Sequence, residues 1–158
     1  IKKFFFKKEN FYSLIFISIL FLIDRYLKSI VIKNFSNKSY FINDFANLSL
    51  TWNTGIGFGF LSSTSSFEYN LVSTLIGLVI TILIYVLINS KFIEKIILSL
   101  IIGGALGNFY DRLVFNAVPD FIDIHYKNFH WFTFNVADIF ITLGVIAFLI
   151  KGLFLKQN

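Results

Sequence analysis

Four long runs of apolar residues alternate with polar segments along this chain. The runs cover about residues 11–32, 69–89, 96–115 and 134–155. At 1.5 Å per residue, a helix of about 20 residues crosses the roughly 30 Å hydrocarbon core of a bilayer. The pattern therefore predicts four transmembrane helices in one integral membrane domain, 1–158. The polar segments between them are residues 33–68 and 116–133.

The first apolar run has an alternative interpretation as a secretory signal peptide, because a cluster of lysines precedes it. A small-residue cleavage site does not follow this run. Instead Asp24, Arg25 and Lys28 appear, and the apolar pattern then resumes. We therefore expect a retained transmembrane helix.

The segment 33–68 contains a pattern typical of a β-strand. Apolar and polar side chains alternate between Ala46 and Trp52, and a period of two indicates a half-buried strand. Residues 41–42 supply a pairing strand across a turn at 43–44. The sequence therefore predicts a small sheet on the membrane surface.

The amino-acid composition excludes two classes of protein. Of the residues, 56% are hydrophobic and 15% are charged, against about 25% charged in an ordinary soluble domain. The chain has no cysteine, which excludes a disulfide scaffold, and its apolarity excludes a disordered chain. We expect residues 116–133 to form a polar loop. The predicted fold class is membrane all-α, with four transmembrane helices and a small extracytoplasmic β-sheet.

The net charge of +5 does not indicate a nucleic-acid partner, because the basic residues flank the apolar runs instead of forming one patch. Eight of the 14 lie at the two termini and in the turn at 90–95. Basic residues beside spans mark the cytoplasmic side, so we expect both termini in the cytoplasm and the segments 33–68 and 116–133 outside. Trp52 and Trp131, the only tryptophans, fall on that outer side, as interfacial anchors do.

Ionisable residues in or near membrane spans are candidate functional residues. In this chain the polar candidates gather toward one face: Asp24, Lys28, Asn108, Asp111, Arg112, Asp120, Asn135 and Asp138. Purely structural interpretations exist for some of them. Asp24 and Lys28 are four residues apart on one helix face and can form an ion pair. Asp111 and Arg112 can fix a helix end.

Three further patterns in the sequence indicate helix packing or ligand contacts. Gly103 and Gly107 form G-x-x-x-G, which lets helices pack closely. The glycines of residues 55–59 resemble a phosphate-binding loop, but no soluble βαβ unit follows, so flexible backbone beside a ligand or lipid is favoured. One further set matches the ligand types of a zinc site, at a spacing too nonspecific to decide: Asp123, His125 and His130. We expect no metal and no cofactor.

The clustered acids leave two chemical interpretations open. Two carboxylates within a few ångströms of one another share one proton, so one can activate water while the other polarises a carbonyl, as in aspartyl proteases. The same residue types also line proton or ion pathways. The residues alone do not decide between a protease and a small ion-pathway protein. They also do not separate Asp111 from Asp120 as a member of the pair.

Five short segments carry the most specific pattern in the chain. They are Asp24-Arg-Tyr-Leu-Lys28, Asn53-Thr-Gly-Ile-Gly-Phe-Gly59, Gly103-Gly-Ala-Leu-Gly-Asn-Phe-Tyr-Asp-Arg112, Val118-Pro-Asp-Phe121 and Phe134-Asn-Val-Ala-Asp138. In this order, and with the four spans, they resemble the motifs of lipoprotein signal peptidase (signal peptidase II), a family of bacterial inner-membrane aspartyl proteases. The glycine-rich segment and the last segment are the specific ones.

The resemblance implies an endopeptidase that removes the signal peptide from diacylglyceryl-modified prolipoproteins, cutting just before the lipidated cysteine. It places catalysis on Asp120 and Asp138. It also implies that Asp111 pairs with Arg112 and supports the segment that carries Asp120. The other positions that it implies in substrate binding or in support of the pair are Asp24, Lys28, Asn53, Gly55, Gly104, Asn108 and Asn135.

The resemblance further implies a monomer in the bacterial inner membrane, with its active site at the outer face and with lipids and lipidated prolipoproteins as partners. Residues 40–61 are then expected to form a mobile lid above the two acids. Two positions depart from the family pattern, because Pro119 stands in place of a valine and Ile56–Gly57 in place of a small pair. Neither change removes an acid, so we expect an active enzyme.

Overall fold

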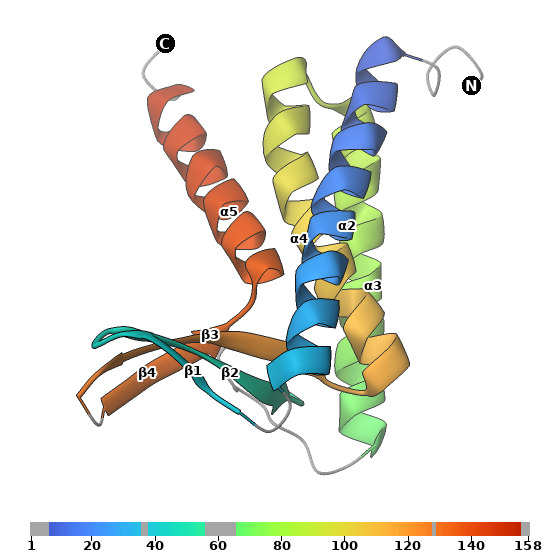
Figure 1. Ribbon diagram of the computed structural model, residues 1–158. Coiled ribbons are helices and arrows are strands. Elements are labelled where there is room, and N and C mark those ends of the chain that lie inside the picture. The colour runs from blue at the N-terminus through green and yellow to red at the C-terminus, as the bar shows by residue number, and fades with distance from the viewer. Residues whose placement is uncertain (1–6, 36–37, 56–65, 128, 156–158) are drawn as a thin grey trace.

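The computed structural model describes residues 7–35, 38–55, 66–127 and 129–155 as four helices and a four-stranded sheet (Figure 1). The helices are α2 (Lys8–Phe35), α3 (Ser66–Asn89), α4 (Phe92–Phe115) and α5 (Val136–Leu155). The strands are β1 (Tyr40–Asn43), β2 (Ala46–Asn53), β3 (Val118–Tyr126) and β4 (Phe129–Phe134). The sheet lies at one end of the helix bundle.

Each predicted apolar run lies in a helix, except for the first two residues of the fourth run. Three segments of the described chain are long and apolar enough to cross a membrane, Phe67–Asn89, Phe92–Phe115 and Val136–Leu153. The first run, predicted at 11–32, lies within α2, which is not among these three. Helix α5 begins at Val136 and not at 134 as predicted, because Phe134 ends strand β4.

Helix α4 is the central helix of the bundle and contacts α2, α3 and α5. Its glycines explain how closely it packs. A β-carbon at Gly103 would lie 2.8 Å from the Leu20 Cβ of α2, and one at Gly104 would meet the Ala137 carbonyl oxygen of α5. At Gly107 the added carbon would meet the Asp24 carboxylate. The close packing predicted from G-x-x-x-G is therefore confirmed for α4 against α2.

The sheet is antiparallel in the order β1-β2-β3-β4. The predicted strand at 46–52 and its hairpin with residues 41–42 are confirmed as β2 and β1. In the turn the Asn43 side chain accepts a hydrogen bond of 2.8 Å from the Phe45 backbone N–H. This bond replaces a backbone contact, as asparagine does in tight turns.

The prediction of a polar loop at 116–133 is wrong. Those residues form most of the hairpin β3–β4. The alternation of β3 was hidden because polar side chains occupy its buried positions, with Asp120, Asp123 and His125 all buried. Pro119 is the second residue of β3, opposite Trp52 of β2, and the start of a strand is a position where proline is tolerated.

The end of the bundle opposite the sheet holds the start of α2, the α3–α4 turn and the end of α5 (Figure 1). In that region the buried Lys95 ammonium donates to the carbonyl oxygens of Leu87 and Ile88, at 2.8 and 3.0 Å. Carbonyls at a helix end lack the usual i+4 donor; Leu87 also accepts from the Ser90 N–H at 3.1 Å, and the lysine supplies a further donor. The two tryptophans both lie at the other end, since Trp52 is in β2 and Trp131 in β4.

Candidate active site

A sharp reversal of the chain after α4 brings Asp120 close to the helix bundle. Asn116, which follows α4, has left-handed backbone angles, with φ 53° and ψ 22°. Asparagine tolerates this conformation better than most residues, and the chain enters β3 two residues later. Asp120, the third residue of β3, therefore lies close to the end of the helix that carries Asn108.

Asp120 is buried, with 3% of its surface exposed. The Asn53 side-chain amide donates to its Oδ2 at 2.9 Å, and the Asn135 amide donates to its Oδ1 at 2.6 Å. Burial raises the pKa of Asp120 from its ordinary 3.8 to about 6, the Asn53 hydrogen bond opposes this rise, and the nearby charge of Asp138 adds to it. The carboxyl group therefore takes up a proton close to neutral pH.

Asp138 is held at the start of α5 by reciprocal hydrogen bonds with Asn135. The Asn135 backbone N–H donates to Asp138 Oδ2 at 3.1 Å, and the Asp138 backbone N–H donates to Asn135 Oδ1 at 3.2 Å. This is the arrangement of a capping box, which satisfies backbone donors at a helix start. The Asn108 amide of α4 donates to the other oxygen, Asp138 Oδ1, at 2.7 Å.

Asn135 therefore contacts both acids through one side chain. Its amide nitrogen donates to Asp120 and its amide oxygen accepts from the backbone of Asp138. Asn135 is fully buried, so water does not compete for these bonds. The side chain of Asn135 consequently ties the Asp120 carboxylate to the backbone at the start of the helix that carries Asp138.

A buried group of charges lies beneath the acids, between α2 and α4. The fully buried Lys28 ammonium contacts Asp24 at 3.0 Å, Asp111 at 2.7 Å and the Asn108 side-chain oxygen at 2.7 Å. Arg25 donates to Asp24 at 3.1 Å and to Asp111 at 2.9 Å. The predicted pairing of Asp24 with Lys28 is confirmed. Arg25 was not among the predicted site residues, although an ionisable residue inside an apolar run is a signal that could have identified it.

The prediction that Asp111 pairs with Arg112 is wrong. Neighbouring residues on a helix point in different directions, and Asp111 faces α2, where Lys28 and Arg25 neutralise it. The guanidinium group of Arg112 instead donates to the carbonyl oxygen of Gly55 at 2.8 Å and to that of Asn108 at 3.2 Å.

A series of hydrogen bonds connects Arg112 through Gly55 and Asn53 to Asp120. Gly55 receives the Arg112 bond on its carbonyl oxygen, and its N–H donates to Asn53 Oδ1 at 2.9 Å. Asn53 in turn donates to Asp120. Of the predicted site residues, only Gly104 lies outside this set of contacts, and it permits the close approach of α4 to the start of α5.

Asp111 and Asp120 differ in a way that bears on chemistry. Asp111 makes ion pairs with two buried or half-buried cations, Lys28 and Arg25. Asp120 receives its hydrogen bonds from neutral amides within the described part of the chain. Asp111 is thus part of a buried ion-pair group, whereas the Asp120 carboxylate has no cation among its hydrogen-bond partners in the described residues.

Two predictions fall partly or wholly outside the described residues. The family departure at Ile56–Gly57 lies there, as does the part of the expected lid from residue 56 to 61. The described part of that segment forms β1, β2 and the buried Gly55.

The zinc-type ligands Asp123, His125 and His130 lie together, with ligand atoms within 4.8 Å of one another.

Comparison with known proteins assigns this arrangement to a family. The family model described as signal peptidase (SPase) II matches residues 16–154. A lipoprotein signal peptidase of Pelagibacter ubique is 46% identical over 154 residues, which cover 95% of this chain and 93% of that protein. One of Francisella tularensis subsp. novicida is 43% identical over 74% of this chain and 75% of its own length.

Solved structures agree with this match. A bacterial membrane enzyme determined by the in meso method at 2.3 Å resolution has a TM-score of 0.73 at 30% identity, over 89% of this chain and 87% of that chain. A second bacterial membrane enzyme, solved at 1.9 Å, has a TM-score of 0.70 at 28% identity, over 88% of this chain and 90% of that chain. Because the family match spans most of the sequence and the Pelagibacter relative is similar over nearly its full length, the chain belongs to the signal peptidase II family.

Proposed function

We propose that this chain removes the signal peptide from diacylglyceryl-modified prolipoproteins by cutting before the lipidated cysteine, with Asp120 and Asp138 as the catalytic pair. The observation that carries the assignment is the shared contact of both acids with the buried Asn135. The aspartic-protease activity follows from the family match over residues 16–154.

The two acids can perform the reaction without a covalent intermediate. Asp120, with a pKa of about 6, and Asp138 hold one proton between them near neutral pH, because two close carboxylates do not both ionise easily. The ionised acid takes a proton from water as the water oxygen bonds to the scissile carbonyl carbon. The protonated acid gives its proton to the carbonyl oxygen. The tetrahedral species then breaks its C–N bond as a proton passes to the leaving amine.

The buried charges act as positioning groups in this proposal. Lys28 orients the Asn108 side chain through its oxygen, and the Asn108 nitrogen then donates to Asp138. Arg112 fixes Gly55, and through it Asn53, which donates to Asp120. Each acid is thus held by an amide that a cation holds in turn, which limits the motion of both carboxylates.

We assign the site to the outer face of the bacterial inner membrane. Lys8, Lys91 and Lys151 are at the end of the bundle opposite the sheet, and basic residues favour the cytoplasmic side. Helix α2, the fourth span of this proposal, has 28 residues and pairs its charged groups internally, as intramembrane charges require. Both termini are then cytoplasmic, and we expect the protein to act as a monomer.

A cleavage assay with two matched precursors tests the function. The purified protein is incubated with a diacylglyceryl-cysteine precursor and with its unmodified cysteine form, and the products are resolved by mass. We expect the lipidated form to be cut and the unmodified form to remain largely intact. Equal cleavage of both forms would contradict the lipoprotein assignment, and ion conduction in liposomes without any cleavage would contradict a protease.

Amide substitutions test the assignment of the acids. Asp120→Asn and Asp138→Asn should each abolish cleavage of the lipidated precursor while the protein stays folded, because an amide neither accepts the proton of water nor shares one. Asp44→Asn, at an exposed acid in the β1–β2 turn, is the matched control and should keep full activity. A nearly normal rate for Asp120→Asn, with a folded but inactive Asp111→Asn, would overturn the assignment.

A further inference from the structure

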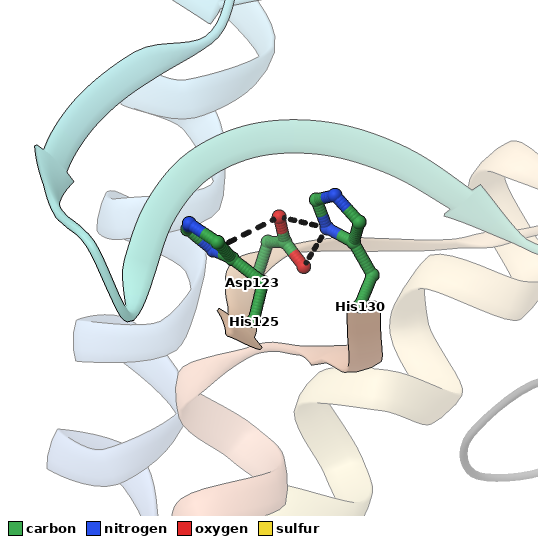
Figure 2. A group of neighbouring side chains, drawn as sticks. All are labelled: Asp123, His125 and His130. Carbon is green, nitrogen blue, oxygen red and sulfur yellow. Dashed lines mark hydrogen bonds and ion pairs between the residues drawn. The ribbon is translucent and has the colours of Figure 1, made fainter. Parts of the chain in front are cut away.

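Two histidines and an aspartate lie on one face of the β3–β4 hairpin (Figure 2). Asp123 and His125 are two residues apart in β3, so their side chains point to the same side of the sheet. A register shift in β4 places His130, and not Trp131, opposite His125. Irregularities of this kind redirect side chains, and here the shift brings the second imidazole to the carboxylate.

The distances among these groups are close to those of a metal site. His130 Nδ1 lies 2.8 and 3.0 Å from the two oxygens of Asp123, and His125 Nδ1 lies 3.7 Å from Asp123 Oδ2. The carboxylate lies between the two rings in Figure 2. A tetrahedral ion with bonds of about 2.0–2.2 Å separates its ligand atoms by about 3.4 Å. Small side-chain rotations are therefore enough to fit one ion.

A second observation points to a ligand at this place. His125 is 8% exposed, and its Nδ1 is a buried atom for which the described residues provide no hydrogen-bond partner. Asn47 of β2 is the cross-strand partner of Asp123, and its buried Oδ1 also lacks a partner within the described ranges. Buried polar atoms are usually satisfied. Two such atoms therefore flank one carboxylate.

We propose that Asp123, His125 and His130 bind a divalent first-row transition metal ion, for which Zn²⁺ is the probe. Two neutral imidazoles and one carboxylate are a common zinc ligand set, and the fourth position is then filled by water or by the Asn47 oxygen. Nothing in this proposal depends on the peptidase chemistry. His130, whose side chain is 58% exposed, leaves the site open to ions from solution.

The site is distinct from the catalytic pair. Asp120 and Asp123 are three residues apart in β3, so alternation places them on opposite faces of the strand. The ion would join β3 to β4, and to β2 where Asn47 binds. Its role is therefore to stabilise the sheet that carries Asp120, and not to activate the attacking water.

Zinc binding to the full-length protein in detergent tests the proposal. The chain has two histidines and no cysteine, so protein purified without a polyhistidine tag offers no other imidazole or thiolate. Isothermal titration with Zn²⁺ should give one site per chain, and Co²⁺ should give the visible absorption of a tetrahedral complex. His130→Ala should weaken Zn²⁺ binding at least about tenfold, since even groups that only orient ligands change affinity by that factor.

Two further variants make the outcome decisive. Asp123→Asn should also weaken binding at least about tenfold, whereas Asp44→Asn removes an exposed acid from the same sheet and should leave the affinity unchanged. His130→Ala changes an exposed side chain, and a circular dichroism spectrum that matches wild type without added metal shows that the variant is folded. A chain that binds no stoichiometric Zn²⁺, or whose affinity His130→Ala does not alter, would overturn the proposal.

Discussion

Replacing Asp120 by asparagine should abolish cleavage and at the same time change how stability depends on pH. The wild-type carboxyl is buried, and burial raises its pKa from 3.8 to about 6. The folded state therefore binds the proton more tightly than the unfolded state does. As pH rises from about 4 past 6, the wild-type protein loses stability because it must bury a charge. Asparagine does not titrate, so the variant lacks this loss.

The size of the effect follows from the pKa difference. A rise from 3.8 to about 6, at 1.36 kcal/mol per pKa unit, corresponds to about 3 kcal/mol when the carboxyl is fully ionised. Between pH 4 and pH 8 about 2–3 kcal/mol of this should appear. The two oxygens of Asp120 accept hydrogen bonds from the Asn53 and Asn135 amides. Asparagine has only one acceptor oxygen, and the loss of the other hydrogen bond costs about 1 kcal/mol at every pH. The pH-dependent part is therefore the quantity to measure.

The assay is denaturant unfolding in detergent at pH 4, 6 and 8, followed by tryptophan fluorescence. Relative to wild type, Asp120→Asn should gain about 2–3 kcal/mol in free energy of unfolding between pH 4 and pH 8. Asp44→Asn, at an exposed position, serves as the control and should follow wild type. A difference between Asp120→Asn and wild type that stays constant across this range would refute the reasoning.

Three further outcomes are expected. Lys28→Met should lower the free energy of unfolding by about 3–5 kcal/mol, because the buried Asp24 and Asp111 then lose a cation. Lys33→Met, at an exposed position of the same helix, should change it by less than about 0.5 kcal/mol. Equal free energies of unfolding for the two variants would contradict this prediction. Gly104→Ala should cost about 1–3 kcal/mol because its β-carbon meets the Ala137 carbonyl, while Gly152→Ala points into open space and should be neutral or stabilising in the same unfolding assay. EDTA and 1,10-phenanthroline should leave the cleavage rate of the folded protein unchanged because two acids need no ion. Loss of cleavage that Zn²⁺ restores, without any loss of folded protein, would instead place a metal in the chemistry.

The parts of this protein that depend on local periodicity could be predicted from the order of its residues. The helices could be predicted because the length and apolarity of a continuous segment are visible in the sequence itself. The alternation between Ala46 and Trp52 predicted β2, and the turn at 43–44 predicted its partner. The i,i+4 spacing of Asp24 and Lys28 predicted their ion pair, since that spacing fixes a contact within one helix.

The contacts between residues that are distant in the sequence could not be predicted in this way. Asp111 pairs with Lys28 of α2 and not with its neighbour Arg112, because the rotation of α4 about its axis selects the partner. The contact of Asn135 with both acids depends on where β3 passes the start of α5. His130 reaches Asp123 only because the β3–β4 register shifts by one residue. Register and helix rotation are set by packing across the whole fold, and a local pattern of residues does not contain them.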